Sequence, residues 1–141
     1  MRRRILLTCL IFGIPLLLLP GLIRFWKLKA YQIQFKSTRQ LLDTIERSRP
    51  PDVDQKTWDA ATGWAFTAYC NVCFSETHVP LTECRELHGD LKERMEQGID
   101  LRTIDWFWAR MKRASPHGQR YITKWEPAFR HEVYGEPQSE P

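Results

Sequence analysis

An apolar run near the N-terminus constrains this chain more than any other feature. Three arginines, Arg2 to Arg4, precede an almost unbroken apolar stretch from Ile5 to Ile23 that contains no charged residue. At a helical rise of about 1.5 Å per residue, this stretch matches the roughly 30 Å hydrocarbon core of a bilayer. Its residues are apolar on every side, which disfavours a half-exposed helix of a soluble domain. We therefore predict a membrane anchor, a single transmembrane helix, within residues 1–25.

A cleaved signal peptide is the alternative interpretation of the same segment. Signal peptides combine a basic start and an apolar core with a cleavage site of the small-x-small type. Here the basic start is present, but the apolar core is followed by PGLIRFW at residues 20–26, which contains no such site. An uncleaved, single-pass signal-anchor therefore fits the segment better.

The residues just after the apolar run have the composition of a membrane interface. Trp26 lies among the basic residues Arg24, Lys27 and Lys29, and such aromatic and basic side chains are enriched where helices leave a bilayer. The basic residues on the two sides of the run favour opposite orientations of the helix. Because a very short basic tail before a first apolar helix usually stays inside, we predict that the C-terminal domain lies outside the cytoplasm.

The net charge of +4 invites a nucleic-acid-binding interpretation, but the charges are segregated along the chain. Residues 24–49 carry a surplus of five positive charges, whereas residues 50–141 carry a surplus of four negative charges. A nucleic-acid-binding domain needs a basic stripe on its folded part, so nucleic acid is not a predicted partner. Basic residues beside a membrane are attracted to anionic lipid head groups by about 1 kcal/mol each. The predicted partner is therefore the lipid bilayer.

Helical periodicity runs through the rest of the chain, and no segment alternates convincingly as a strand. The predicted fold class is all-α, a transmembrane helix followed by a small soluble bundle of about five helices. A basic juxtamembrane helix should occupy residues 26–49, and in an alternative arrangement the anchor continues into it as one long rod. A compact helical domain should occupy residues 50–134, and residues 135–141 should form a disordered tail.

Helix ends can be placed from capping residues. Asp52 or Asp54 should cap a largely apolar helix at the centre of the bundle, and Thr82 should cap the next helix, which stops at Gly98. Asp100 should cap a fourth helix. A turn is expected at residues 115–118, and a capping box at residues 123–126 should begin the last helix.

Cysteine and histidine residues form the one constellation that suggests chemistry. Cys70 and Cys73 are three residues apart on one helix face, and Cys84 and His88 are four apart on the next helix. If these two helices pack antiparallel, the four side chains meet, and thiolate and imidazole groups are the ligands that structural zinc prefers. The sequence thus predicts a possible zinc site, with His78 as a substitute ligand.

Three alternatives compete with zinc at these cysteines. Cysteine often serves as a small buried apolar side chain, so the thiols can simply pack in the core. Outside the cytoplasm, a disulfide between Cys84 and either Cys70 or Cys73 is expected. A redox-active Cys-x-x-Cys pair is the weakest alternative, because such pairs lie at a helix N-terminus, whereas Cys70 and Cys73 come near the end of their helix.

Enzymatic function is not predicted, because no catalytic motif can be picked out. An interface is suggested instead by Trp106, which is about 200° from Trp108 around a helix and so stays near the surface when Trp108 packs inward. Exposed tryptophan residues often anchor protein partners. We therefore expect a non-enzymatic interaction or accessory protein, with another membrane or envelope protein as candidate partner and no cofactor apart from zinc.

Overall fold

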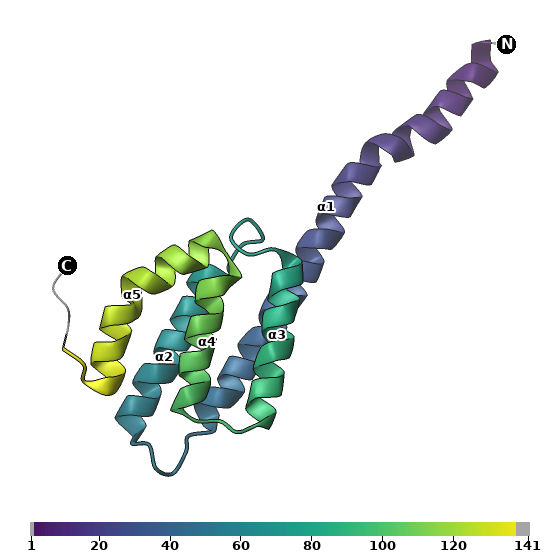
Figure 1. Ribbon diagram of the computed structural model, residues 1–141. Coiled ribbons are helices and arrows are strands. Elements are labelled where there is room, and N and C mark those ends of the chain that lie inside the picture. The colour runs from purple at the N-terminus through teal and green to yellow at the C-terminus, as the bar shows by residue number, and fades with distance from the viewer. Residues whose placement is uncertain (1, 138–141) are drawn as a thin grey trace.

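The computed structural model describes the backbone of residues 2–137 and the side chains of residues 19–137 (Figure 1). Within that part of the chain all regular structure is α-helical, which confirms the predicted all-α class. The helices are α1 (Arg2–Arg47), α2 (Gln55–Val72), α3 (Leu81–Glu96), α4 (Leu101–Ala114) and α5 (Pro116–Tyr134).

The helices form a four-helix bundle with a fifth helix on one side. The C-terminal half of α1 packs against α2 and α3, and α4 packs against the same two helices from the other side. In this arrangement α2 and α3 are diagonal to each other, and among the described residues they make no helix–helix contact. Helix α5 covers α2 and α4 (Figure 1). The connection between α2 and α3, residues 73–80, therefore crosses the bundle end, and we refer to it as the diagonal connection.

Helix α1 is far longer than the bundle that it joins. Its buried face within the bundle is formed by Tyr31, Thr38, Leu42 and Ile45, which recur at helical spacing. Its N-terminal half projects away from the other helices (Figure 1). The predicted anchor and the predicted juxtamembrane helix are therefore parts of one uninterrupted helix, as the long-rod alternative proposed.

The predicted transmembrane run falls largely on residues whose side chains are not described. Among the described residues, no helix contains a stretch long and apolar enough to cross a bilayer. Most of the predicted transmembrane run, Ile5–Ile23, belongs to residues 1–18, whose side chains lie outside the described residues. The same applies to Cys9, and residues 138–141 of the predicted tail are also outside the described part.

Two of the predicted caps are confirmed. The Asp54 carboxylate accepts a hydrogen bond from the Thr57 backbone N–H at 2.9 Å at the start of α2. At α4, Asp100 accepts from the Thr103 N–H at 2.9 Å while the Thr103 hydroxyl faces the Asp100 N–H, which forms a capping box. These bonds satisfy backbone donors that the first helical turn leaves free.

Other predicted helix ends are wrong. Thr82 does not cap α3, because the helix begins at Leu81 and its N-cap position is Pro80, which has no side chain able to accept a hydrogen bond. The predicted turn at residues 115–118 is the N-cap and the start of α5, and the predicted capping box at residues 123–126 lies inside that helix. Ser115 is the actual N-cap: its hydroxyl accepts from the Gly118 N–H at 3.0 Å, and Pro116 occupies the first helical position.

The core lies between α2 and its neighbours. The predicted central helix is confirmed, since α2 contacts α1, α4 and α5. Trp108 of α4 is 1% exposed and stacks on Phe129 of α5 at 4.5 Å between ring centroids. Trp64 of α2 meets Trp108 edge-on. Aromatic packing therefore holds α5 onto the bundle.

Candidate functional site

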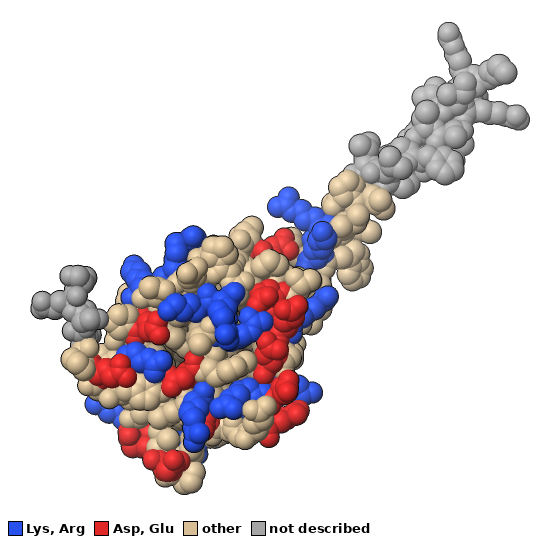
Figure 2. Space-filling view, viewed as in Figure 1, with Lys and Arg blue, Asp and Glu red and all other residues tan. Residues whose placement is uncertain are grey.

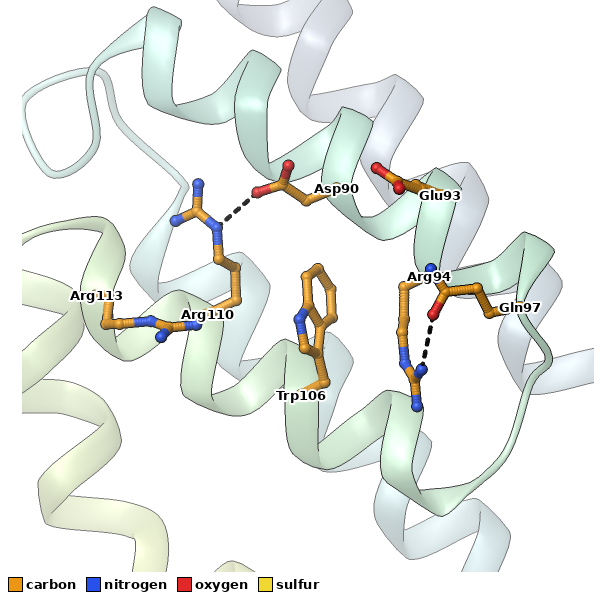
Figure 3. A pocket seen from close by; sticks show the side chains of 7 residues that line it. All are labelled: Asp90, Glu93, Arg94, Gln97, Trp106, Arg110 and Arg113. Atoms are coloured by element: carbon orange, nitrogen blue, oxygen red, sulfur yellow. Dashed lines mark hydrogen bonds and ion pairs between the residues drawn. The ribbon is translucent and has the colours of Figure 1, made fainter.

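A groove between α3 and α4 surrounds the predicted partner-contact residue, Trp106. Its volume is about 410 Å³, and Trp106 lies half-buried in it (Figure 3). The prediction that this side chain stays near the surface while Trp108 packs inward is consistent with this position. The groove is lined by Asp90, Glu93, Arg94, Gln97, Trp106, Arg110 and Arg113.

Arg110 organises one end of this groove. It extends from α4 to α3, where its Nε donates to the Asp90 carboxylate at 2.8 Å (Figure 3). Its guanidinium also forms an ion pair with Glu83. The Arg110 side chain is only 14% exposed. These ion pairs join residues that are 20 and 27 positions apart in the sequence, so helix periodicity alone does not predict them.

The Arg110 ion pairs should stabilise the contact between α3 and α4. We expect Arg110→Met to lower the free energy of unfolding by about 1–2 kcal/mol, because Glu83 keeps a partly buried charge without its partner, although solvent screens part of this effect. The matched control is Lys112→Met on the same helix, whose ion pair with Glu126 at 2.9 Å is more exposed and should contribute under about 0.5 kcal/mol. Urea unfolding of both variants measures this difference, and equal losses would contradict it.

The other end of the groove has charged groups that are less fully paired. The Arg94 guanidinium donates to the Gln97 side chain at 3.1 Å, but its Nε is buried without a hydrogen-bond partner among the described residues. Arg113 and Glu93 are exposed on opposite sides of the groove. The groove thus combines a tryptophan surface with charges of both signs, a composition that suits a protein surface better than a small apolar ligand.

The predicted zinc ligands are only partly brought together. Cys73 and Cys84 are both buried, and interaction with the Cys84 thiol together with burial raises the pKa of Cys73. Cys70 instead faces α1, where Arg39 and Asp43 influence its thiol, and burial raises its pKa. The predicted antiparallel packing of α2 on α3 is wrong, because α1 and α4 lie between these helices. Cys70 and His88 consequently lie on two helices that, within the described part of the chain, do not contact each other.

The histidines have other partners. His88 Nδ1 is 3.2 Å from the Thr38 hydroxyl of α1, and burial lowers the pKa of its imidazole. His78, the substitute ligand, lies on the diagonal connection and stacks on His117 of α5 at 4.0 Å between centroids. Within the described residues, no group of three or more His, Cys, Asp or Glu side chains is placed to hold a metal ion. Zinc binding stays a prediction.

The stack of His78 on His117 was not predicted from sequence. It continues to Phe74, whose ring lies 4.4 Å from that of His78. Burial, the neighbouring His117 and Arg120 together lower the pKa of His78. Nothing in the local sequence indicates this pairing, because the two histidines come close only when α5 begins at Pro116, and the sequence interpretation placed a turn there.

The predicted membrane-interface residues are all exposed on the projecting part of α1. Arg24, Trp26, Lys27 and Lys29 lie on the side of the bundle from which α1 leaves. The Lys29 ammonium is 6.0 Å from the centre of the Phe25 ring, which in turn meets Trp26 edge-on. Figure 2 shows basic side chains where α1 leaves the bundle and uncharged side chains further out along the helix. This order matches that of an interfacial segment.

Comparison of the chain with protein-family models, with curated protein sequences and with solved structures gives no match. The functional argument therefore depends on the residues and contacts of this chain alone.

Proposed function

We propose that this chain is a single-pass, membrane-anchored accessory protein whose helical bundle binds another membrane or envelope protein through the groove at Trp106. The observation that carries the proposal is the row of large apolar side chains that α1 exposes beyond the bundle. The exposed side chains are Leu19, Leu22, Ile23, Phe25, Trp26 and Leu28.

An isolated helix with such a row is unfavourable in water. Trp26 is 63% exposed and Leu22 is 57% exposed, and each apolar side chain of this size gains roughly 1.5–3 kcal/mol when it is fully removed from water. The row overlaps the uncharged run Ile5–Ile23 and extends beyond it to Leu28, with Arg24 and Lys27 in between. A bilayer is the surrounding that suits both segments, and the basic residues that follow would meet its head groups.

The bundle is the part that would meet a partner. Tryptophan and arginine are the residues most enriched at the energetic centres of protein interfaces, and the groove places Trp106 between Arg94 and Arg110 (Figure 3). Because the domain would lie outside the cytoplasm, the proposed partner is another membrane or envelope protein.

Membrane anchoring is tested by fractionation of the full-length chain. We expect it to float with membranes on a density gradient and to resist extraction by alkaline carbonate, while a variant that lacks residues 2–23 stays in the soluble fraction. Flotation distinguishes membrane-bound protein from aggregated protein, because aggregates sediment. The proposed anchor would be refuted by full-length protein that remains with soluble proteins, or by a deletion variant that still floats.

Partner binding is tested by substitution in the groove. We expect Trp106→Ala to reduce the yield of a cross-linked partner by about 10- to 100-fold, since truncation of a central tryptophan typically costs 2 kcal/mol or more of binding free energy. The matched control is Trp125→Ala on α5, a tryptophan that is 37% exposed outside the groove. Circular dichroism establishes that both variants fold. Equal cross-linking by the two variants would remove the groove from the proposal.

A further inference from the structure

The end of the bundle from which α1 leaves carries an exposed phenylalanine. Phe74, the second residue of the diagonal connection, is 60% exposed, more than any other large apolar side chain outside α1 among the described residues. It lines a groove of about 260 Å³ together with Leu28, Tyr31 and Phe35 of α1. We call this the exit groove, because it lies where α1 projects from the bundle (Figure 1). The exposed apolar surface of α1 thus continues onto the bundle.

Contacts on two sides hold Phe74 at the surface. Its ring is 4.4 Å from that of His78, which stacks on His117 of α5 at 4.0 Å between centroids. On the other side, the Tyr31 hydroxyl donates a hydrogen bond to the carbonyl of Cys73, the residue before Phe74. Single exposed apolar side chains are ordinary on protein surfaces, but this one is fixed in place beside the apolar row of α1. The two together form a continuous surface that favours removal from water.

Trp26 relates the depth of the exit groove to that of a membrane. Leu28 and Tyr31 follow Trp26 in the same helix, at about 3 and 8 Å along its axis. The head-group region on each side of a bilayer is about 5–8 Å thick. Because α1 is one uninterrupted helix, the bundle is limited in how far it can turn away from the anchor. With Trp26 at the edge of the hydrocarbon core, the exit groove lies among the head groups.

The charges around the exit groove suit a lipid surface. Lys27 and Lys29 are exposed on α1, and Arg120, one helical turn after His117, is exposed on α5. The half-buried Glu76 also lines the groove and opposes these positive charges. Aromatic and basic side chains are the types enriched where proteins meet the surface of a bilayer, and basic residues attract anionic head groups. This end of the bundle therefore has the composition of an interfacial surface.

We propose that Phe74 and the exit groove form a second membrane contact, in which the lipid head-group region of the bilayer covers the groove and surrounds the Phe74 ring. The inference rests on the proposed membrane anchor and extends it, because the bundle itself then meets the leaflet that α1 leaves. One phenylalanine and a few basic residues bind a membrane only weakly, as a single short anchor does. The contact therefore depends on α1, which keeps the bundle beside the bilayer.

Photo-cross-linking tests which molecule covers Phe74. The full-length chain is reconstituted in vesicles of phosphatidylcholine and phosphatidylglycerol, with the photoreactive amino acid p-benzoylphenylalanine in place of Phe74, Trp26 or Tyr134. Tyr134 is the matched control, because it is an aromatic residue, 36% exposed, at the opposite end of α5 from His117. After irradiation, mass spectrometry measures the lipid adducts. We expect similar yields at positions 74 and 26, about tenfold or more above the yield at position 134.

The position of Trp26 separates failure of this inference from failure of the anchor. Lipid adducts at position 26, with a yield at position 74 no higher than at position 134, would overturn the second contact and leave the anchor in place. Adducts at neither position 26 nor position 74 would overturn both. Cross-linking of position 74 to a second copy of the chain or to another protein, in place of lipid, would also overturn the inference. Circular dichroism of the three labelled chains establishes that they fold, as expected for replacements at exposed side chains.

Discussion

Replacing Gly118 with alanine is expected to lower the free energy of unfolding by about 3 kcal/mol, because the first turn of α5 has no room for a methyl group. An alanine Cβ at this position would overlap the backbone carbonyl oxygen of Met111 in α4 and would lie 3.2 Å from Cγ1 of Val72 in α2. A backbone oxygen cannot rotate away as a side chain can. The two helices would have to separate, which disturbs the aromatic packing between α4 and α5.

Two other helical glycines serve as controls for this substitution. Gly63 of α2 and Gly89 of α3 have no atom within 4 Å of the position that a Cβ would occupy. Alanine there should be neutral or should stabilise the helix by up to about 1 kcal/mol, because glycine loses more backbone entropy on folding. Urea unfolding measures the free energy of unfolding of the three variants. The comparison distinguishes the cost of lost space at Gly118 from the gain in helix propensity. If Gly118→Ala were as stable as the two controls, the close approach of α5 to α4 would be wrong.

Amphipathic periodicity was enough to predict that the chain is helical, and the buried faces of the helices follow the same spacing. Leu42 and Ile45 of α1, and Leu87 and Leu91 of α3, are buried as their spacing predicts. The apolar residues on one face of a helix are predictable because that face is the one removed from water. Their spacing does not indicate which other helix packs against that face.

Helix starts were predictable only where a carboxylate provides the cap. Asp54 and Asp100 accept the hydrogen bonds expected of them. Ser115 was missed because Pro116 and Gly118 together are typical of a turn, although proline also suits the first position of a helix. The deciding fact is that Gly118 is needed for close contact with α4, and this contact exists only in three dimensions.

For the candidate sites, too, features set by residues close in the sequence could be predicted, whereas contacts between distant residues could not. The sequence prediction placed Cys73 and Cys84 beside Cys70 and His88 by packing their two helices antiparallel. That Cys70 and His88 do not join them depends on the diagonal placement of α2 and α3, which no spacing along the chain specifies. Likewise, the surface position of Trp106 follows from helix geometry, but the groove around it requires Arg110 to reach α3.

Truncation of Trp108 should have the largest effect of any single substitution in the core. This indole is 1% exposed, stacks on Phe129 at 4.5 Å and meets Trp64 edge-on at 6.1 Å. Trp108→Ala removes both contacts and leaves a cavity where α2, α4 and α5 meet, so we expect a loss of about 4 kcal/mol. Denaturant unfolding followed by far-UV circular dichroism measures this loss. A loss below about 1 kcal/mol would mean that α5 is not held by this stack.

Replacement of the same residue by phenylalanine separates packing from hydrogen bonding. The Trp108 Nε1 is buried without a hydrogen-bond partner among the described residues, and an unpaired buried donor costs about 1–3 kcal/mol. Trp108→Phe removes this donor and keeps an aromatic ring against Phe129, so the gain from removing the donor should nearly cancel the loss of packing.

The control is Trp58→Phe in α2, because the equally buried Trp58 donates its indole N–H to the Glu46 carbonyl at 2.9 Å. That variant loses both packing and a hydrogen bond, so it should be less stable than Trp108→Phe by about 1–2 kcal/mol. The opposite order would show that the Trp108 indole has an acceptor in solution, such as a buried water molecule.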